Sequence, residues 1–336
     1  MQIESLNSMF ILGAFTWCVL AVIWLLALEK SAKARWMHQL HALLPVVAIG
    51  GYLLMAQDSD LARATEQWLV AGMAIIAILT PVWLLTLVTR NAGVMDVAYS
   101  LTASLTAMAL LVIDGNYSVR QWGLMALIAV WSGRLVHHAS GTNLGSNGEQ
   151  QPYAKWRVQF GSRWWWWSYF QVFLLQGGLV WIWILPVVLA IGAKPGPLST
   201  LDIVGMAVWL VGFVFQAGAD WQLKRFKANP SNKGKVLQSG LWSLSRHPNY
   251  FGEAMMWWGY FVCGLAHPCG WIGIVGPLYV TWFMSKGSAA PMLDRHMLKS
   301  KVDYAQYVAR VPGFFPFFKS PSDAVLLKRF QEKRSS

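Results

Sequence analysis

The sequence is poor in charged residues, and this scarcity excludes an ordinary soluble domain. Only 12% of its 336 residues are charged and 56% are hydrophobic, whereas soluble domains carry about 25% charged residues. Acidic residues are the scarcer kind, with 15 Asp and Glu against 27 Lys and Arg. This composition predicts an integral membrane protein whose few charges gather in its loops.

Cysteine is also scarce, which excludes a disulfide framework and a cysteine-based metal centre. Cys18, Cys263 and Cys269 lie in or beside apolar segments, with no CxxC pair and no Cys/His cluster near them. We therefore expect no metal site. Small buried thiols are favoured over a Cys263–Cys269 disulfide, which the sequence leaves open.

The sequence shows no linker and no internal repeat, and we expect no cleavable leader. No Gly/Ser tract divides the chain, and the first apolar run has neither a basic n-region nor an A-x-A cleavage site. We expect one integral domain whose first apolar run is retained as a membrane span.

Long apolar runs, by contrast, recur along almost the whole chain, and they predict an all-α, polytopic membrane bundle of about nine transmembrane helices. Each run is long enough, or nearly so, to cross roughly 30 Å of hydrocarbon. The predicted spans are 9–28, 38–56, 67–88, 94–113, 120–139, 165–192, 202–219, 250–266 and 270–286.

The basic residues follow the loops between these spans. An outside N-terminus places 23 of the 27 Lys and Arg in the inner segments, which are 29–37, 89–93, 140–164, 220–249 and 287–336 with Lys286 at its edge. This positive-inside pattern predicts a cytoplasmic C-terminus and a multi-pass membrane protein. Because topology explains the basic loops, the expected partner is the lipid bilayer and no nucleic acid.

The run "RWWWWSYF", residues 163–170, has two interpretations. It could form a stacking platform for a planar ligand. A membrane-interface belt is favoured, because Trp and Tyr concentrate at interfaces and Arg163 marks the inner side.

Ionisable residues within the predicted spans are functional candidates, because inserting one costs about 2.5–3.5 kcal/mol. Asp96, Arg134, Asp220 and Glu253 stand out. In "GVMDVAYSL", Asp96 shares a helical face with Tyr99. Asp96 is either an ion-pair partner of Arg134 or a carboxyl kept protonated by desolvation, able to donate a hydrogen bond to a substrate oxygen.

The stretch "DWQLKRFK" places Asp220, Lys224 and Lys227 on one helical stripe where a predicted span leaves the membrane. The stripe could hold an anion. An ordinary i,i+4 ion pair with positive-inside lysines is the favoured alternative.

The stretch "SRHPNYFGE" predicts the start of a helix, because proline is favoured at the first position of a helix, here Pro248. The free backbone N–H groups of that start, flanked by Arg246 and His247, suit a phosphate or a carboxylate. Asn249 and Glu253 are four residues apart and face one side. They suit the amide or hydroxyl groups of a nicotinamide or a ribose.

The residues alone indicate an enzyme that joins a soluble anionic cofactor to a lipid-like substrate. A transporter of lipids or sterols fits the spans equally well. It would more often show broken helices repeated in two halves, and the sequence shows no such repeat.

Three elements in order resemble the steroid 5-alpha-reductase family, in particular its bacterial branch of membrane proteins. They are "GVMDVAYS", "SRHPNYFGE" and "LDRHMLKSKVDYAQYVARVPGFFP". The second element alone also resembles isoprenylcysteine carboxyl methyltransferases. The resemblance implies additional N-terminal transmembrane helices at 1–66, a reductase-like membrane domain at 67–318 and a basic cytoplasmic tail at 319–336.

The resemblance further implies NADPH-dependent reduction of the C4–C5 double bond of a 3-oxo-4-ene steroid or a similar lipid enone. A hydride would go to the beta carbon, an acid would polarise the ketone, and a proton would reach the alpha carbon. The family's acid is a Glu after Gln, where this sequence has Met95–Asp96. Trp131 stands where the family has a ketone-binding Tyr, and Tyr99 is the substitute.

Cofactor positions follow from the same resemblance and from the two basic stretches. No GxGxxG fingerprint is present, so a Rossmann fold is not expected to hold the nucleotide. The predicted cofactor-binding residues are Tyr153, Arg157, Gln216, Asp220, Lys224, Lys227, Arg246, His247, Asn249, Tyr250, Glu253, Asp294, Arg295 and Tyr304.

We therefore predict a membrane reductase that takes NADPH from the cytoplasm and a steroid-like substrate from the lipid. A membrane methyltransferase that uses S-adenosylmethionine is the first alternative. A lipid or sterol transporter is the second. The co-purifying nucleotide would separate the three.

Overall fold

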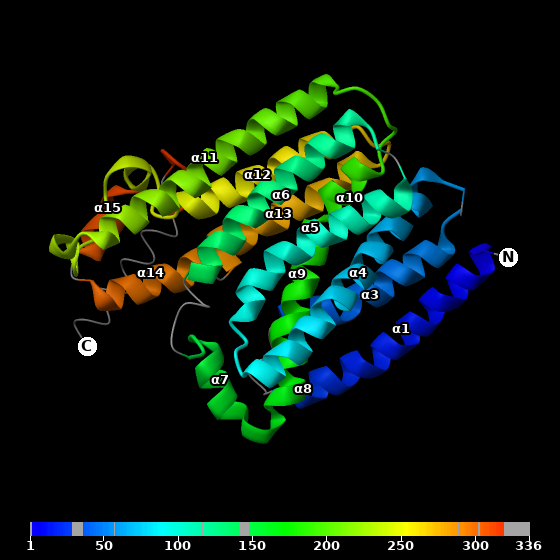
Figure 1. Ribbon diagram of the computed structural model, residues 1–336, viewed down its shortest axis with the longest axis horizontal. Coiled ribbons are helices and arrows are strands. Elements are labelled where there is room, and N and C mark those ends of the chain that lie inside the picture. Colours follow the sequence, from blue (N-terminus) through cyan, green and yellow to red (C-terminus); the bar gives the residue numbers. More distant parts are fainter. Residues whose placement is uncertain are drawn as a thin grey trace. The chain divides into compact units, whose positions relative to one another are not determined.

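The chain is a multi-pass membrane protein and, over the residues described, all-helical (Figure 1). The computed structural model describes residues 2–28, 36–56, 58–115, 117–141, 148–287, 289–301 and 303–318. The predicted cytoplasmic tail, 319–336, lies outside the described residues. Each predicted span contains helix, which confirms the all-α prediction.

The number of spans is only partly supported. Four helices are long and apolar enough to cross a membrane, and these are Ser8–Ala27, Asp60–Thr89, Val94–Asp114 and Thr200–Ala228. A pair bent by 50°, Tyr153–Trp183 and Leu185–Ile191, would make a fifth. The expectation of nine spans with an outside N-terminus stays a prediction.

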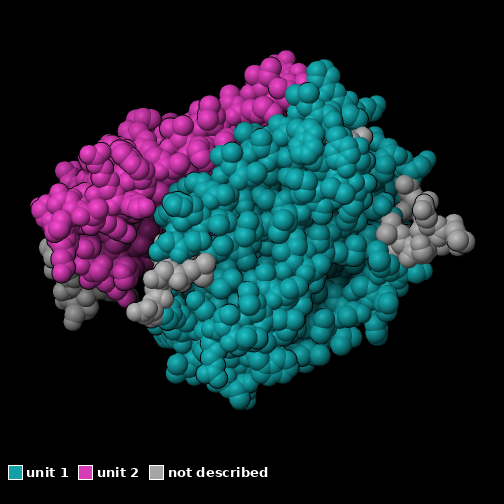
Figure 2. All heavy atoms as spheres, in the orientation of Figure 1, with its two compact units in different colours: residues 1–197, 267–270 teal, residues 198–266, 271–336 magenta. Residues whose placement is uncertain are grey.

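Contacts divide the chain into two compact units, coloured separately in Figure 2. Unit 1 comprises Met1–Pro197 with His267–Gly270, and unit 2 comprises Leu198–Ala266 with Trp271–Ser336. The sequence predicted one continuous domain over 67–318 and no boundary near residue 197. The signal for this boundary is weak because no linker composition marks it.

Unit 1 consists of long helices followed by a chain of short ones. Ser59 caps the third helix by accepting the Ala62 N–H, as expected of an N-cap serine. Pro186 lies in the first turn of the last helix, where the missing N–H accounts for the bend. The helices are α1 (Gln2–Ala27), α3 (Trp36–Leu54), α4 (Asp60–Thr89), α5 (Val94–Asp114), α6 (Val119–Ala139), α7 (Tyr153–Phe160), α8 (Trp164–Ser168), the π-helical turn Tyr169–Leu174, α9 (Leu175–Trp183) and α10 (Leu185–Ile191).

Unit 2 is built on two long helices, α11 (Thr200–Ala228) and α12 (Pro248–Gly264). A capping box between Ser199 and Asp202 starts α11. Pro248 is the first residue of α12, as predicted. The shorter helices that follow are α13 (Val275–Trp282), α14 (Ala289–Ser300) and α15 (Tyr304–Arg310).

Glycines bring α11 and α12 unusually close together. A Cβ added to Gly252 would lie 2.4 Å from the Gly212 carbonyl oxygen and 2.4 Å from the Gln216 nitrogen. One added to Gly259 would lie 2.6 Å from the Gly205 carbonyl oxygen. Both contacts are with backbone, which cannot swing aside, so only glycine allows this spacing. The close approach fixes which side chains face each other along the pair.

The remaining structural predictions concern cysteine and tryptophan. All three cysteines are free thiols, but only Cys263 is buried, whereas Cys269 is partly exposed and Cys18 is exposed. The prediction of small buried thiols is therefore confirmed for Cys263 alone. Within "RWWWWSYF", Trp164 and Trp167 are buried, and Trp167 stacks on Phe160 with ring centroids 3.8 Å apart. Trp165 is 58% exposed. Part of the run therefore packs the fold, and the interface role of Trp165 stays a prediction.

Candidate functional site

The first polar group lies at the start of α5 in unit 1. Asp96 occupies the first turn of that helix. The Tyr153 hydroxyl, from the first residue of α7, donates a hydrogen bond to the Asp96 carboxylate at 2.6 Å. Tyr153 is 5% exposed. The sequence assigned Tyr153 to the cofactor, and the structure instead gives it to the predicted catalytic carboxyl.

A second contact holds α7 against the start of α5. Glu149 accepts the Ala92 N–H at 2.7 Å and forms a two-pronged ion pair with Arg157, at 2.7 and 2.8 Å. Arg157 also lies over the Trp164 ring, 4.8 Å from its centroid. Arg157 was predicted to contact the nicotinamide or phosphates, and here Glu149 neutralises its charge. No sequence pattern singled out Glu149, because its partners Arg157 and Ala92 lie 8 and 57 residues away, and neither spacing brings residues together within one helix.

The predicted catalytic residues of unit 1 meet between α5 and α6. The Tyr99 ring packs edge-on against Trp131, with centroids 6.1 Å apart. The Ser132 hydroxyl donates to the Ser100 carbonyl at 3.0 Å and ties the two helices together. Asp96 lies one turn before Tyr99 on α5. The structure therefore brings together an acidic pair, Asp96 with Tyr153, and an aromatic pair, Tyr99 with Trp131.

In unit 2, two cross-helix hydrogen bonds join α11 to α12. The Gln216 amide donates to one oxygen of Glu253, whose other oxygen accepts the Trp257 indole N–H at 2.9 Å. One turn away, the Asn249 amide donates to Asp220 at 2.9 Å. Asn249 and Glu253, which the sequence placed on one face of a helix, thus pair across the helices with Asp220 and Gln216, where the glycine contacts hold the backbones together.

The start of α12 is anchored to a buried carboxylate. Asp294, on α14, accepts hydrogen bonds from Arg246 at 2.9 Å, His247 at 2.9 Å and Tyr304 at 2.5 Å. Arg246 and His247 are both almost fully buried. The sequence predicted that these two side chains present their charge to an anion, and the structure shows them turned to Asp294 instead. The predicted contact with an anion is therefore not direct in this geometry.

Burial alone would raise the pKa of the Asp294 carboxyl. The hydrogen bond and charge of His247, followed by those of Arg246, outweigh burial and hold the pKa well below its usual range. Burial and the neighbouring Asp294 carboxylate raise the pKa of the Tyr304 hydroxyl. Asp294 is therefore a carboxylate and Tyr304 a neutral hydrogen-bond donor at neutral pH.

The remaining predicted residues lie nearer the surface of unit 2. The Tyr250 ring stacks on His247, with centroids 5.4 Å apart and planes 5° from parallel. Lys224 and Lys227 are exposed on the last turns of α11. Arg295 is exposed and donates to the Pro291 carbonyl of its own helix at 2.9 Å.

A polar cavity of about 430 Å³ lies at the same end of α11. Its lining includes Gln222, Arg225 and Asn229, with the Arg225 guanidinium 5.5 Å from the centroid of the Trp221 ring. The sequence did not single out this cavity. Its signal was a cationic helix end followed by a polar turn, which many solvated helices share.

Several buried polar atoms of unit 2 have no hydrogen-bond partner within the described part of the chain. Two of these atoms belong to predicted cofactor residues, namely the Gln216 side-chain oxygen and the Nδ1 atom of His247. A buried polar atom usually has a partner, because leaving one unpaired costs about 1–3 kcal/mol. A hydroxyl- or amide-bearing ligand could supply these partners. Over the same described ranges, no group of three or more His, Cys, Asp and Glu is arranged for a metal ion.

Comparison with known proteins places the chain in a family. Residues 82–311 match the model of a family described as "Protein of unknown function (DUF1295)", and the chain belongs to that family. The match runs across the boundary between unit 1 and unit 2. It includes all seventeen residues predicted for catalysis and cofactor binding. No solved structure matches the chain significantly.

Curated relatives are similar over short stretches. A Delta(14)-sterol reductase of Ascobolus immersus is 33% identical over 108 residues, which cover 26% of this chain and 24% of that protein. A Delta(14)-sterol reductase of Mus musculus is 26% identical over 164 residues, covering 43% and 37%. A probable O-methyltransferase of Ustilaginoidea virens is 37% identical over 102 residues, covering 30% and 34%. The chain thus spans between about a quarter and just over a third of these relatives' lengths.

Proposed function

We propose that this member of the DUF1295 family is an NADPH-dependent membrane reductase that saturates a carbon–carbon double bond in a sterol-like lipid. The observation that carries the proposal is the recurrence of Delta(14)-sterol reductases among its relatives, in fungi, plants and animals. We further propose the inner membrane of a bacterium as its location. The steroid 5-alpha-reductase resemblance supplies the finer proposal, a 3-oxo-4-ene substrate.

We assign cofactor binding to unit 2, whose residues fit the chemistry of a dinucleotide. Exposed Lys224 and Lys227 suit its phosphates. The buried Gln216 oxygen suits its hydroxyl and amide hydrogens, and the His247 Nδ1–H suits one of its oxygens. NADPH, when bound, supplies a hydride. Asp294 acts as a positioning residue in this assignment, because it fixes His247 and the start of α12.

We assign proton chemistry to Asp96 and Tyr153 of unit 1. Saturating the double bond adds one hydride and one proton, so the enzyme must provide a proton source and stabilise the charge that develops. A short hydrogen bond between a carboxyl and a phenol can hold a proton and donate it to a substrate oxygen or carbon. Removing one preorganised donor of this kind typically costs ~10²–10³ in rate.

The test uses the purified full-length protein in nanodiscs with NADPH. One substrate is progesterone, a 3-oxo-4-ene, and the other is a sterol with an 8,14-diene. We expect NADPH oxidation and a product two mass units heavier with at least one of them, and the finer proposal requires progesterone. Asp96→Asn should lower kcat about 10²–10³-fold with NADPH affinity unchanged.

Asp60→Asn is the matched control, because Asp60 is a half-exposed carboxylate of unit 1 that pairs with its helical neighbour Arg63. It should leave turnover unchanged. The proposal fails if NADPH neither raises the melting temperature nor is oxidised with either sterol. The role of Asp96 in proton transfer is refuted if Asp96→Asn turns over as fast as the wild-type protein.

The second candidate is a methyltransferase that uses S-adenosylmethionine, and the O-methyltransferase relative favours it. This cofactor carries no phosphate, so Lys224 and Lys227 would have no role in holding it. A rise in melting temperature with S-adenosylmethionine, and none with NADPH, would establish this candidate over the reductase.

A further inference from the structure

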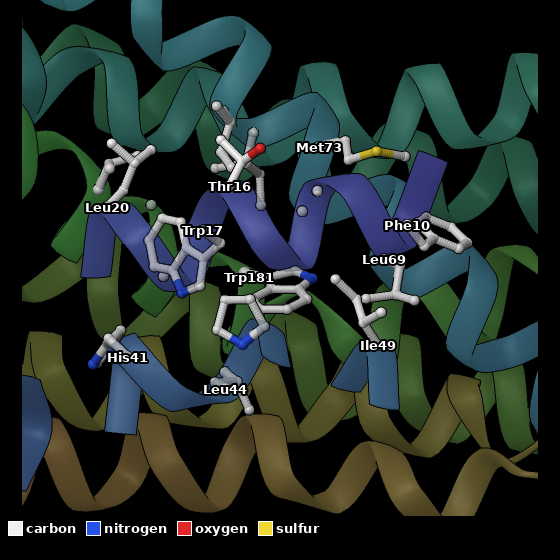
Figure 3. Close-up of a pocket in the computed structure, with 18 of the residues that line it drawn as sticks. Phe10, Thr16, Trp17, Leu20, His41, Leu44, Ile49, Leu69, Met73 and Trp181 are labelled. Atoms are coloured by element: carbon white, nitrogen blue, oxygen red, sulfur yellow. The ribbon is translucent and has the colours of Figure 1, made fainter. Parts of the chain in front are cut away.

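A cavity of about 480 Å³ lies inside unit 1 and is lined by none of the residues assigned above to catalysis or to the cofactor. Its walls come from α1, α3, α4 and α9, with side chains pointing inward from each (Figure 3). Helices α1 and α3 precede the residues that match the family model. The cavity is therefore largely built by the N-terminal helices that this chain adds to the matched region.

The two ends of the cavity differ in chemistry. Phe10, Ile49 and Leu69 lie toward one end, and Trp17 and His41 toward the other (Figure 3). Two polar hydrogens in the cavity wall already have acceptors within unit 1. The Trp17 indole N–H donates to the Ala42 carbonyl at 2.8 Å, and the Thr16 hydroxyl donates within its own helix. These residues therefore present apolar surface to the cavity.

The polar end contains a buried donor that needs an acceptor. Trp24, two turns beyond Trp17 on α1, lines the cavity and is 2% exposed. Its indole N–H has no hydrogen-bond acceptor among the residues that the structure describes. A buried indole N–H normally finds a partner. A ligand oxygen at this end of the cavity would supply one.

Glycines shape the wall opposite α1. A Cβ added to Gly178 would lie 2.4 Å from the His41 ring, and one added to Gly72 would lie 2.9 Å from the Trp181 ring. The absence of a side chain at these two positions lets the His41 and Trp181 rings approach the neighbouring helices closely. The rigid rings of Trp17, Trp24 and Trp181 line the cavity, and they suit a rigid fused-ring skeleton better than flexible acyl chains.

We infer that this cavity is a binding site for a sterol-like lipid with one polar group, separate from the residues of the proposed reaction. The volume is within the range of sites for ligands of that size, about 300–1,000 Å³. The single hydroxyl or keto oxygen lies at the Trp24 and His41 end, and the ring system fills the apolar length toward Phe10. Binding here requires neither NADPH nor turnover, so the inference stands apart from the proposed function.

The experiment uses the full-length protein in nanodiscs without NADPH and a cholesterol analogue that carries a diazirine. After irradiation, mass spectrometry locates the labelled peptides. We expect label on α1, α3, α4 or α9 that excess cholesterol removes. A phosphatidylcholine present at the same excess should not remove it.

Gly13→Leu and Gly50→Leu form a matched pair of variants. Gly13 lines the cavity, and a Cβ there meets no atom within 4 Å. Gly50 has equally open space but does not line the cavity. Both changes replace a helical glycine by a good helix former, so both should fold. Gly13→Leu should lower labelling at least tenfold, and Gly50→Leu should leave it unchanged.

Trp24→Phe tests the polar end, because it keeps the ring and removes the N–H. Cholesterol should compete about tenfold less well in this variant, the loss expected for one buried hydrogen bond. Cholestane, which has no oxygen, should compete equally in both proteins. Equal labelling of Gly13→Leu and wild type, label confined to other helices, or equal competition by phosphatidylcholine would each overturn the inference. Asp96→Asn should keep full labelling, which separates this site from the proposed activity.

Discussion

The buried carboxylate of Asp294 offers the strictest test of the structure of unit 2. Replacing it by alanine would leave the Arg246 guanidinium buried without its ion partner. The guanidinium would keep its bonds to backbone carbonyls, such as the one to Val311 at 2.7 Å. His247 and Tyr304 would each lose a hydrogen bond to a charged acceptor. The change therefore removes three contacts at once from a site with little access to water.

The magnitude follows from the burial of the pair, whose side chains are 1% and 7% exposed. Breaking a buried ion pair by removing one partner costs about 3–5 kcal/mol. A change of 1 kcal/mol shifts the melting temperature by about 2–4 °C in a protein of 150–250 residues. Because the shift per kcal/mol falls as the chain lengthens, Asp294→Ala should lower the melting temperature of this 336-residue protein by about 4 °C or more.

The assay is thermal unfolding of the full-length protein in detergent, without added nucleotide. Asp303→Ala is the matched control, because Asp303 is exposed and precedes α15 without capping it through its side chain. It should leave the melting temperature within about 1 °C of the wild-type value. An equally small shift for Asp294→Ala would show that Asp294 is not the buried centre of this cluster, and the reasoning would be refuted.

Three further predictions concern the pH dependence of Asp294, the close packing of α11 and α12, and the hydroxyl of Tyr153. Because the folded-state pKa of Asp294 is depressed, the stability that it contributes is present above the unfolded carboxyl pKa of about 3.9 and is lost as the pH falls below it. Between pH 6 and pH 3, the melting temperature of the wild-type protein should therefore drop further than that of Asp294→Asn. Parallel curves for the two proteins would contradict this prediction. Gly252→Ala should lower the melting temperature, since its Cβ would meet backbone at 2.4 Å, at a cost of roughly 1–3 kcal/mol for overpacking. The control is Gly133→Ala, whose Cβ meets nothing within 4 Å and which should keep or raise the melting temperature. Equal effects of the two changes would argue against the close packing of α11 and α12. Tyr153→Phe should lower kcat about 10²-fold with NADPH affinity unchanged, as expected for the loss of a proton-transfer partner, and wild-type turnover in this variant would remove Tyr153 from the mechanism.

Local patterns in the sequence were sufficient to predict the helices and the pairs along them. Apolar runs marked the long helices, and Pro248 marked the start of α12, because both signals act within a few residues. Helices α7, α14 and α15 lie in segments that were predicted as inner loops. Asp96 with Tyr99, and Asn249 with Glu253, share helix faces for the same reason. The bend before Leu185 also follows from a proline that is visible in the sequence.

Partners across helices could not be predicted, because they depend on how the helices pack. Tyr153 lies 57 residues from Asp96, and its sequence context suggested only a polar loop near the cofactor. Glu149 had no pattern at all, although its carboxylate holds both Arg157 and the start of α5. A single sequence gives the types of the charged residues but not which of them neutralise each other.

The stretch "SRHPNYFGE" shows how far this limit reaches. Taken alone, Arg246 and His247 beside a helix start indicate an exposed anion site. In the fold, the Arg246 backbone N–H donates to the Pro312 carbonyl at 2.8 Å, and its guanidinium donates to the Val311 carbonyl at 2.7 Å. The segment around residue 246 therefore binds the chain that follows α15, and Asp294 of α14 completes this buried cluster through its ion pair with Arg246.

The buried contacts of Arg246 and His247 determine how a cofactor role for this stretch has to be tested. Asn249 is one residue beyond Pro248, so its position on α12 depends on the buried contacts of Arg246 and His247. A substitution at Asp294 would then weaken cofactor binding by displacing the helix start, without any contact between Asp294 and the cofactor. Asn249→Ala separates the two effects, because it removes one cross-helix hydrogen bond and leaves the Asp294 cluster intact. It should weaken NADPH binding with little change in melting temperature, whereas Asp294→Ala should lower both.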